Sequence, residues 1–210
     1  SLFAPESEIA FAIENSFSIS EYLHLGGSSI SARFSKMDDT TMRIDYYCIN
    51  SSFFESTNRK FRLLSIPSED HNKQLVIVQP FNKYDAMNML SGLSIEDIES
   101  ERGEGYQENT YCIPQGKYFS EYDFTDPLIE YGIRRIFFPD VAELTNLTNS
   151  QSAFISGIYS FTKSNFEVLG EPAAYSSLPE ETLWLDSPFL YFEIDNEDSL
   201  LLGIGRLISP

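Results

Sequence analysis

Apolar residues along this chain fall mostly into short runs whose length and spacing are typical of β-strands. Ile9–Ile13 is apolar at every position, as in a strand buried on both faces. Thr41–Tyr46 alternates polar and apolar residues, as in a strand with one exposed face. Phe61–Ile66 and Leu75–Val78 flank the polar turn Pro67–Asn72, so we expect these two runs to form a β-hairpin with a long connection.

The spacing of apolar residues becomes helical in only two places. Tyr84–Ser100 predicts one or two short helices, and Pro127–Tyr131 predicts another, which ends at Gly132, a residue favoured just after a helix. Tyr111–Phe119 predicts a strand interrupted by a proline and a glycine. The remaining extended segments are 152–161, 165–168, 188–194 and 200–208. No internal repeat or boundary is visible, so residues 1–210 are expected to form a single, strand-dominated domain.

The charge of the chain narrows its expected partners. Its 210 residues carry 14 Lys and Arg against 32 Asp and Glu, a formal net charge of −18 at pH 7. Nucleic acids and anionic membrane surfaces bind proteins through clusters of Lys and Arg, so neither is expected as a partner of this acidic chain. With 14% aromatic and only 22% charged residues, the chain has the composition of a folded protein. No apolar run approaches the ~20 residues of a membrane-spanning helix, so no membrane insertion is expected.

Residues suited to catalysis or metal binding are few. The two cysteines and two histidines are Cys48, Cys112, His24 and His71. Their wide spacing does not fit a zinc cluster, and neither histidine stands in a catalytic motif. Paired acids such as Glu180-Glu181 are expected by chance in so acidic a chain and indicate a solvated face. We therefore expect no enzyme activity, no metal and no cofactor.

Two N-glycosylation sequons begin at Asn50 and Asn146. Together with the even number of cysteines, they favour the secretory pathway and a secreted glycoprotein. A cytoplasmic location is the alternative. The chain starts at a serine and shows no signal-peptide pattern, so we expect a mature form, a proteolytic fragment or part of something longer.

The end of the chain resembles the carboxy-terminal signature of the serpins. Ser187–Ile194 is similar to the family's "PFLF" strand, and the acidic turn Asp195–Asp198 follows it. Leu200–Pro210 is similar to the family's final strand, which also contains Gly-Arg and ends in proline. The other segments that resemble serpin elements, in the family's order, are 9–19, 61–67 with 74–80, 113–119, 123–133 and 137–147. Six pieces in the correct order point to serpin ancestry.

The resemblance implies an α+β serpin fold with parts of the A, B and C sheets and few short helices. A full serpin is nearly twice as long, and nothing here corresponds to the elements before the third strand of the A sheet. We therefore interpret the chain as the carboxy-terminal half of a serpin, or as a truncated serpin-like protein without the amino-terminal helical half. Sheet edges and apolar faces left without neighbours are expected to recruit that half, another chain or a second copy.

Serpins that inhibit proteases insert their cleaved reactive loop as a new central strand of the A sheet. The resemblance places the equivalent loop at 170–187. Its hinge comprises Gly170, Glu171, Pro172, Ala173 and Ala174, and a count onward from the hinge places the scissile region at Leu183, Trp184 and Leu185. An inserting hinge needs small apolar residues. Here Glu171 would bury a carboxylate and Pro172 would remove a ladder hydrogen bond, so only the two alanines suit insertion.

These features predict a non-inhibitory serpin-like protein that acts by binding or as a structural component. The loop is also short, and the family's tryptophan and histidine beside the A sheet have no counterpart, since Tyr22 or Leu23 and Thr162 stand there. For Trp184, packing against the sheet is expected rather than a specificity role. The alternatives are part of a serine protease inhibitor whose other half is absent from this chain, and an acidic structural or storage protein of an assembly.

The resemblance also brings the two cysteines together. Cys48 and Cys112 fall on segments that correspond to neighbouring strands of the C sheet. A disulfide between them is therefore one expectation, and a pair of buried free thiols is the other.

Overall fold

The computed structural model describes residues 8–18, 22, 27–89, 98, 107–139, 141–144, 146, 153–167 and 178–210. The chain divides into two compact units. The first consists of Ser1–Phe17 and Tyr118–Ser164, and the second of Ser18–Lys117 and Asn165–Pro210. Each unit is assembled from two separate stretches of sequence, which is why the pattern of polar and apolar residues shows no boundary between them.

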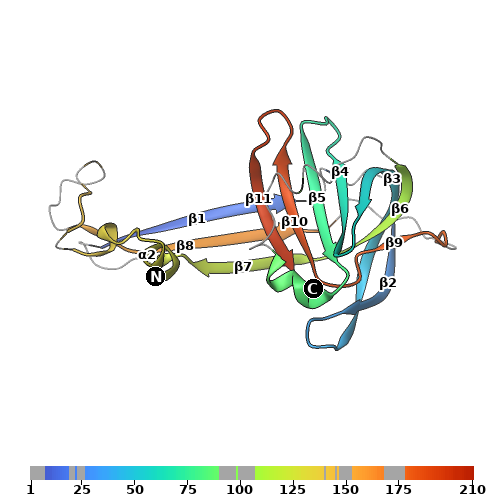
Figure 1. Ribbon diagram of the computed structural model, residues 1–210, viewed down its shortest axis with the longest axis horizontal. Helices are drawn as coiled ribbons and strands as arrows, with labels where there is room; N and C mark the ends of the chain where they lie inside the picture. Colours follow the sequence, from blue (N-terminus) through green and yellow to red (C-terminus); the bar gives the residue numbers. More distant parts are fainter. Residues whose placement is uncertain are drawn as a thin grey trace. The chain divides into compact units, whose positions relative to one another are not determined.

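The first unit is built on a three-stranded sheet in the order β1-β8-β7 (Figure 1). Its elements are β1 (Glu8–Ser18), β7 (Lys117–Asp123), the helix α2 (Thr125–Glu130), the 3-10 helix η4 (Arg135–Phe137) and β8 (Phe154–Asn165). The connection from β7 to β8 packs on the start of β8 through an apolar cluster. Its buried members are Phe137, Leu144, Ala153 and Ile155.

The limits of α2 follow from its local sequence. The backbone N–H of Thr125 donates to the carboxylate of Asp123 at 2.8 Å, which satisfies one of the free donors at the start of the helix. Past its end, Gly132 has φ of 101°, a conformation that glycine adopts at no steric cost. The predicted helix at Pro127–Tyr131 is therefore confirmed, although it begins two residues earlier.

The second unit is built on an eight-stranded sheet in the order β11-β10-β5-β4-β3-β6-β9, with β2 paired to β3. Its elements are β2 (Ser28–Ser35), β3 (Thr41–Thr57), β4 (Phe61–Pro67), β5 (Lys73–Pro80), the 3-10 helix η2 (Lys83–Met87), β6 (Gln107–Pro114), β9 (Leu183–Trp184), β10 (Phe189–Asp195) and β11 (Leu201–Leu207). β3 pairs with β2 and β6 along its first part and with β4 at its end. It thus joins the two halves of this sheet.

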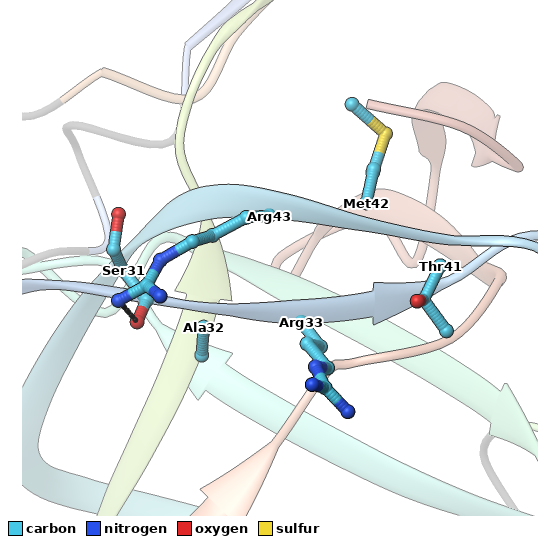
Figure 2. Close-up of a pocket in the computed structure, with 6 residues that line it drawn as sticks. All are labelled: Ser31, Ala32, Arg33, Thr41, Met42 and Arg43. Carbon is cyan, nitrogen blue, oxygen red and sulfur yellow. Dashed lines mark hydrogen bonds between the residues drawn. The ribbon is translucent and has the colours of Figure 1, made fainter.

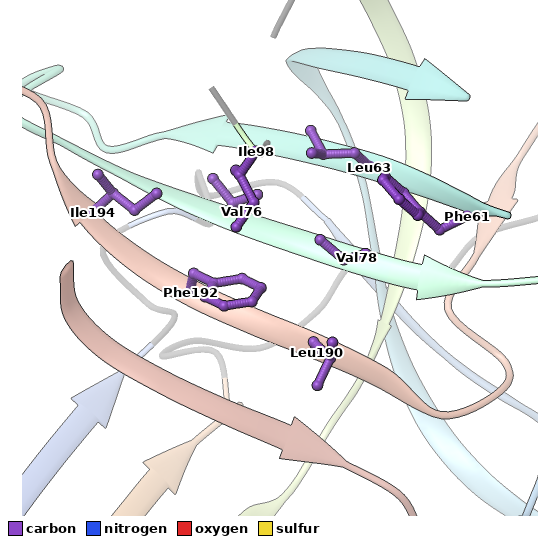
Figure 3. Close-up of a cluster of buried hydrophobic side chains, with 8 residues drawn as sticks. All are labelled: Phe61, Leu63, Val76, Val78, Ile98, Leu190, Phe192 and Ile194. Carbon is purple, nitrogen blue, oxygen red and sulfur yellow. The ribbon is translucent and has the colours of Figure 1, made fainter. Parts of the chain in front are cut away.

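The core of the second unit lies on β4, β5 and β10. Figure 3 shows its buried side chains, which are Phe61, Leu63, Val76, Val78, Ile98, Leu190, Phe192 and Ile194. β5 is buried from Gln74 to Pro80, so the apolar run predicted within it has both faces covered. Each fully buried Val, Leu, Ile or Phe contributes about 1.5–3 kcal/mol relative to exposure, so this cluster is a main source of stability.

The strand-dominated α+β architecture with mixed sheets is confirmed. The hairpin predicted from Phe61–Ile66 and Leu75–Val78 is β4–β5, and the two strands predicted at the end of the chain pair as β10–β11. Both hairpins are antiparallel and join strands that are neighbours in sequence.

Three predicted elements differ from the structure. Tyr111–Phe119 is divided between β6 and β7, which lie in different sheets, and Gly116 at the break has φ of 154°. β8 covers most of the predicted segment 152–161 and continues to Asn165, whereas Phe166 and Glu167 of the predicted segment 165–168 are not in a strand. β2 was not predicted, because the serines around its apolar residues resemble a loop. Of the predicted helix Tyr84–Ser100, the described residues show mainly η2.

Candidate functional site

The end of the predicted loop is held in the sheet of the second unit. Leu183 and Trp184 form β9, which pairs in parallel with Tyr111 and Cys112 of β6. The backbone N–H of Leu185 donates to the carbonyl of Cys112 at 3.1 Å. The Trp184 ring packs edge-on against Tyr46, with ring centroids 5.2 Å apart. Trp184 is thus packed against the sheet, as expected from its being a lone aromatic residue in this segment.

This placement differs from the prediction of a scissile region at Leu183–Leu185. Leu185 is only 1% exposed, and the backbone of β9 is engaged with β6. A protease binds an exposed, extended segment of its target, and β9 does not offer one. The residues just before β9, Pro179–Glu181, are exposed.

Cys112, the β6 residue paired with Trp184, lies next to Cys48 of β3. They stand opposite each other in the β3–β6 register, and both are fully buried. The structure joins them as a disulfide, with their Cα atoms 4.0 Å apart. Because β9 pairs with Tyr111 and Cys112 of β6, the disulfide ties to β3 the strand on which β9 depends.

The beginning of the loop is held as well. Phe166, the first residue after β8, is fully buried, and its ring packs edge-on against Tyr191 at 5.3 Å between centroids. Its backbone N–H donates to the carbonyl of Gly116 at 2.8 Å. Glu167 forms an ion pair with Lys117 at 2.7 Å. The predicted hinge residues Gly170, Glu171, Pro172, Ala173 and Ala174 lie outside the described residues.

In the first unit, β1 and β8 are direct neighbours in the sheet. Lys163 of β8 forms an ion pair with Glu14 of β1, and this contact holds the pKa of the Glu14 carboxyl below its ordinary value. Both side chains are more than half exposed, so the ion pair itself adds little stability. An additional strand could enter between β1 and β8 only if their hydrogen bonds separated.

The turn between β2 and β3 is clamped by η2. Asp39 at this turn has φ of 64°, an unusual conformation for a residue with a side chain. The Lys83 ammonium lies 2.8 Å from the Asp39 carboxylate and donates to the carbonyl of Lys36. The Tyr84 hydroxyl donates to the other carboxylate oxygen of Asp39. These contacts hold the pKa of Asp39 below its ordinary value and raise that of Tyr84.

Replacing Lys83 with methionine is expected to loosen this turn, because a half-buried charge-assisted donor is lost. The expected cost is about 1 kcal/mol, with faster amide hydrogen exchange at residues 36–42. Lys60→Met, at an exposed lysine elsewhere in the second unit, is the matched control and should change neither quantity. Unchanged exchange in Lys83→Met would refute the clamp.

The Asp39 carboxylate also makes the stability of this turn depend on pH. Since the Asp39 pKa is lowered on folding, its contribution to stability is complete above the ordinary value of about 3.9 and is lost as the pH falls through the lower folded value.

Both sequon asparagines are exposed. Asn50 lies in β3 opposite Thr110 of β6, and Asn146 lies in the connection between η4 and β8. Within the described ranges, no group of three or more His, Cys, Asp or Glu side chains could hold a metal ion. Among those same residues, no helix is long and apolar enough to cross a membrane.

A family model described as Serpin (serine protease inhibitor) matches residues 30–210, most of the chain. The chain belongs to the serpin family. Serpins from several organisms are similar to it: leukocyte elastase inhibitor of Equus caballus is 26% identical over 194 residues, and Serpin H1 of Rattus norvegicus is 20% identical over 166. These matches cover 85% and 76% of this chain, but 51% and 40% of the relatives. The chain thus spans about half the length of the curated serpins it matches.

Solved serpin structures share this fold. Uncleaved ovalbumin superimposes with a TM-score of 0.75 at 17% identity, over 87% of this chain and 52% of ovalbumin. Native protease nexin-1 with heparin gives a TM-score of 0.74 at 18% identity, over 95% of this chain and 55% of nexin-1. At these identities the likeness establishes the fold, and it agrees with the serpin sheets expected from the sequence.

Proposed function

We propose that this serpin chain acts by binding and does not trap proteases. The observation that carries the proposal is the hinge sequence, where Glu171 and Pro172 stand in a segment that would have to become the central strand of a sheet. An unpaired carboxylate costs several kcal/mol to bury, roughly, and proline removes a ladder hydrogen bond. β1 and β8 are paired in this structure, so an inserted strand would have to separate them.

The held ends of the loop support the same conclusion. β8 ends at Asn165 and β9 begins at Leu183, so 17 residues of sequence separate the two strands, and Phe166, the first of them, is buried. Burial of a phenylalanine is worth about 1.5–3 kcal/mol, so any movement of Phe166 away from Tyr191 would be opposed by about this amount.

The experiment is incubation of the native protein with a serine protease, followed by a denaturing gel. We expect cleavage within the exposed segment that precedes β9, with no covalent complex, because the loop does not insert in time to trap the acyl-enzyme. A band resistant to denaturation, at the summed mass of protease and protein, would refute non-inhibition. Glu171→Ala/Pro172→Ala is the informative variant: gain of such a band would identify these two residues as the barrier.

One observation favours the alternative, part of an inhibitory serpin. The leukocyte elastase inhibitors are 26–27% identical to this chain over most of its length, and their names assign them inhibition of an elastase. The third reading, an acidic structural or storage component, rests on the net charge of −18 alone. The gel experiment separates the inhibitory reading from the two non-inhibitory ones.

We further propose that another polypeptide completes the fold: an amino-terminal half, another chain or a second copy. β11 is the last strand of its sheet, and Leu200, Leu201, Leu202 and Ile204 on or next to it are 39–55% exposed. β1 is likewise the last strand of the sheet in the first unit, and Ile13 on it is 51% exposed. Apolar edges of this kind pair with other chains unless they are covered.

The disulfide and the exposed sequons support a proposal that the protein passes through the secretory pathway, where disulfides persist and asparagines are glycosylated. A shift of intact mass on enzymatic deglycosylation at Asn50 and Asn146 would test it.

A further inference from the structure

Two arginines face each other at the free edge of the sheet in the second unit. Arg33 of β2 stands directly opposite Arg43 of β3, and both side chains are exposed. Like charges in opposed positions of a sheet repel each other. The chain has 32 acidic residues but only 14 Lys and Arg, so placing two of these together is not a consequence of abundance. No ion pair between described residues involves either arginine.

The backbone of β2 presents hydrogen-bond donors at this edge. The N–H of Ser35 points away from β3 and donates to the carbonyl of Asp186 at 2.7 Å. In an antiparallel pair the N–H groups of every second residue point to the same side, so those of Arg33 and Ser31 are also turned to the free edge. The backbone N–H groups of Ser31 and Arg33 could therefore donate to the carbonyls of an added strand.

The carbonyl groups at the same edge are already engaged. The Tyr46 hydroxyl donates to the carbonyl of Arg33 at 3.2 Å, and the Arg43 guanidinium donates to the carbonyl of Ser31 at 3.4 Å. The edge therefore offers free donors and two cationic groups, whereas each of these two carbonyls already accepts one hydrogen bond. A ligand that suits it brings acceptors and negative charge.

Figure 2 shows the hollow at this edge. It is lined by Ser31, Ala32, Arg33, Thr41, Met42 and Arg43. The Arg43 head group turns back to the Ser31 carbonyl, and the Arg33 head group extends away from it, so the two guanidinium groups splay apart. A carboxylate accepts well-directed hydrogen bonds from a guanidinium and would relieve the repulsion between the two.

We propose that this edge binds an extended acidic segment of a partner protein. Its backbone carbonyls accept from the N–H groups of Ser31 and Arg33, and one of its carboxylates lies between Arg33 and Arg43. A long polyanion fits less well, because Asp45, hydrogen-bonded to Ser31, places a negative charge on the next residue pair of the same face. This binding is separate from protease inhibition and holds whether or not the loop inserts.

The test is fluorescence anisotropy at low salt with a labelled threonine octapeptide that carries one central glutamate (the Glu-Thr peptide), so that its carboxylate can lie at the two arginines with none beside Asp45. The native protein is expected to bind this peptide and not the matching Lys-Thr peptide. Arg33→Ser/Arg43→Ser should weaken binding by about tenfold or more, since charge-assisted hydrogen bonds are lost. Arg59→Ser removes one exposed charge elsewhere in the second unit and should leave binding unchanged.

Ser31→Pro separates strand addition from simple charge attraction, because it removes an edge donor and leaves both arginines. It is expected to weaken binding as well. The melting temperature of each variant shows whether it is folded. If the double variant is unfolded, binding is measured with Arg33→Ser alone. The proposal is wrong if the Glu-Thr peptide does not bind, if Arg59→Ser weakens binding as much as the double variant, or if sulfate, free glutamate or polyphosphate competes as strongly as unlabelled peptide.

Discussion

Reducing the Cys48–Cys112 disulfide is expected to lower the free energy of unfolding by about 4 kcal/mol. This is the chain-entropy value for a bond that spans 64 residues. The loss also acts locally, because β6 is then held to β3 only by backbone hydrogen bonds and side-chain packing such as that of Tyr111 on Phe53, and β9 depends on β6. Urea unfolding with and without reductant measures the change, and intact mass confirms a gain of two hydrogens.

The double variant Cys48→Ala/Cys112→Ala is the control for this prediction. It should show the same loss of stability in the absence of reductant, and reductant should have no further effect on it. In limited proteolysis of the reduced protein, the first cleavage is expected in the segment around β9. Equal midpoints with and without reductant, together with an unchanged mass, would show that the two thiols are free in solution.

Replacing Gly205 with alanine is expected to destabilise the fold by roughly 2–3 kcal/mol and to lower the melting temperature by about 5–10 °C. Gly205 stands opposite Tyr191 in the β10–β11 pair, and a Cβ atom there would lie 2.1 Å from the tyrosine ring. The ring is only 7% exposed and packs against Phe166, so it has little room to yield. Thermal unfolding followed by circular dichroism measures the effect.

Gly203→Ala is the matched control, two residues away on the same strand. Its Cβ atom would lie 3.6 Å from the Cβ of Glu193, an ordinary contact. The control is expected to stay within about 0.5 kcal/mol of the native protein, since surface substitutions usually do. If both variants melt alike, Tyr191 does not cover Gly205 as the structure has it.

Strands with continuous apolar runs could be predicted from the sequence because burial on both faces leaves a strong signal. β5 and β10 are examples, and each pairs with an apolar run that is its neighbour in sequence across a polar turn. β2 was missed although Ile30, Ala32 and Phe34 alternate with polar residues from Ser28 onward. A strict count of period-two positions would have found it.

Other features depend on contacts that are distant in sequence. β3 was predicted as Thr41–Tyr46 but extends to Thr57, because its second part gains a new neighbour in β4. Gly116 divides a predicted strand between two sheets, and nothing local indicates which sheet each part joins.

The candidate site shows the same limit. The resemblance to serpins placed the loop at 170–187, and a residue count then put cleavage near Trp184. The contact of Trp184 with Tyr46 agrees with the expected packing against the sheet, but the residue count could not show that Leu183 and Trp184 form a strand beside Cys112. The register of β9 depends on these long-range contacts. The resemblance placed Cys48 and Cys112 on neighbouring strands and left a disulfide or two free thiols open, and the structure shows the disulfide.

This chain is proposed to act by binding and to be completed by another polypeptide. Light scattering on the native sample, run beside a denaturing gel, measures this. We predict a particle larger than the 23.9 kDa of this chain, either with a second band on the gel or as an assembly of the chain with itself. A stable, compact monomer of 23.9 kDa would show that the exposed edges at β1 and β11 need no partner, and would contradict the account.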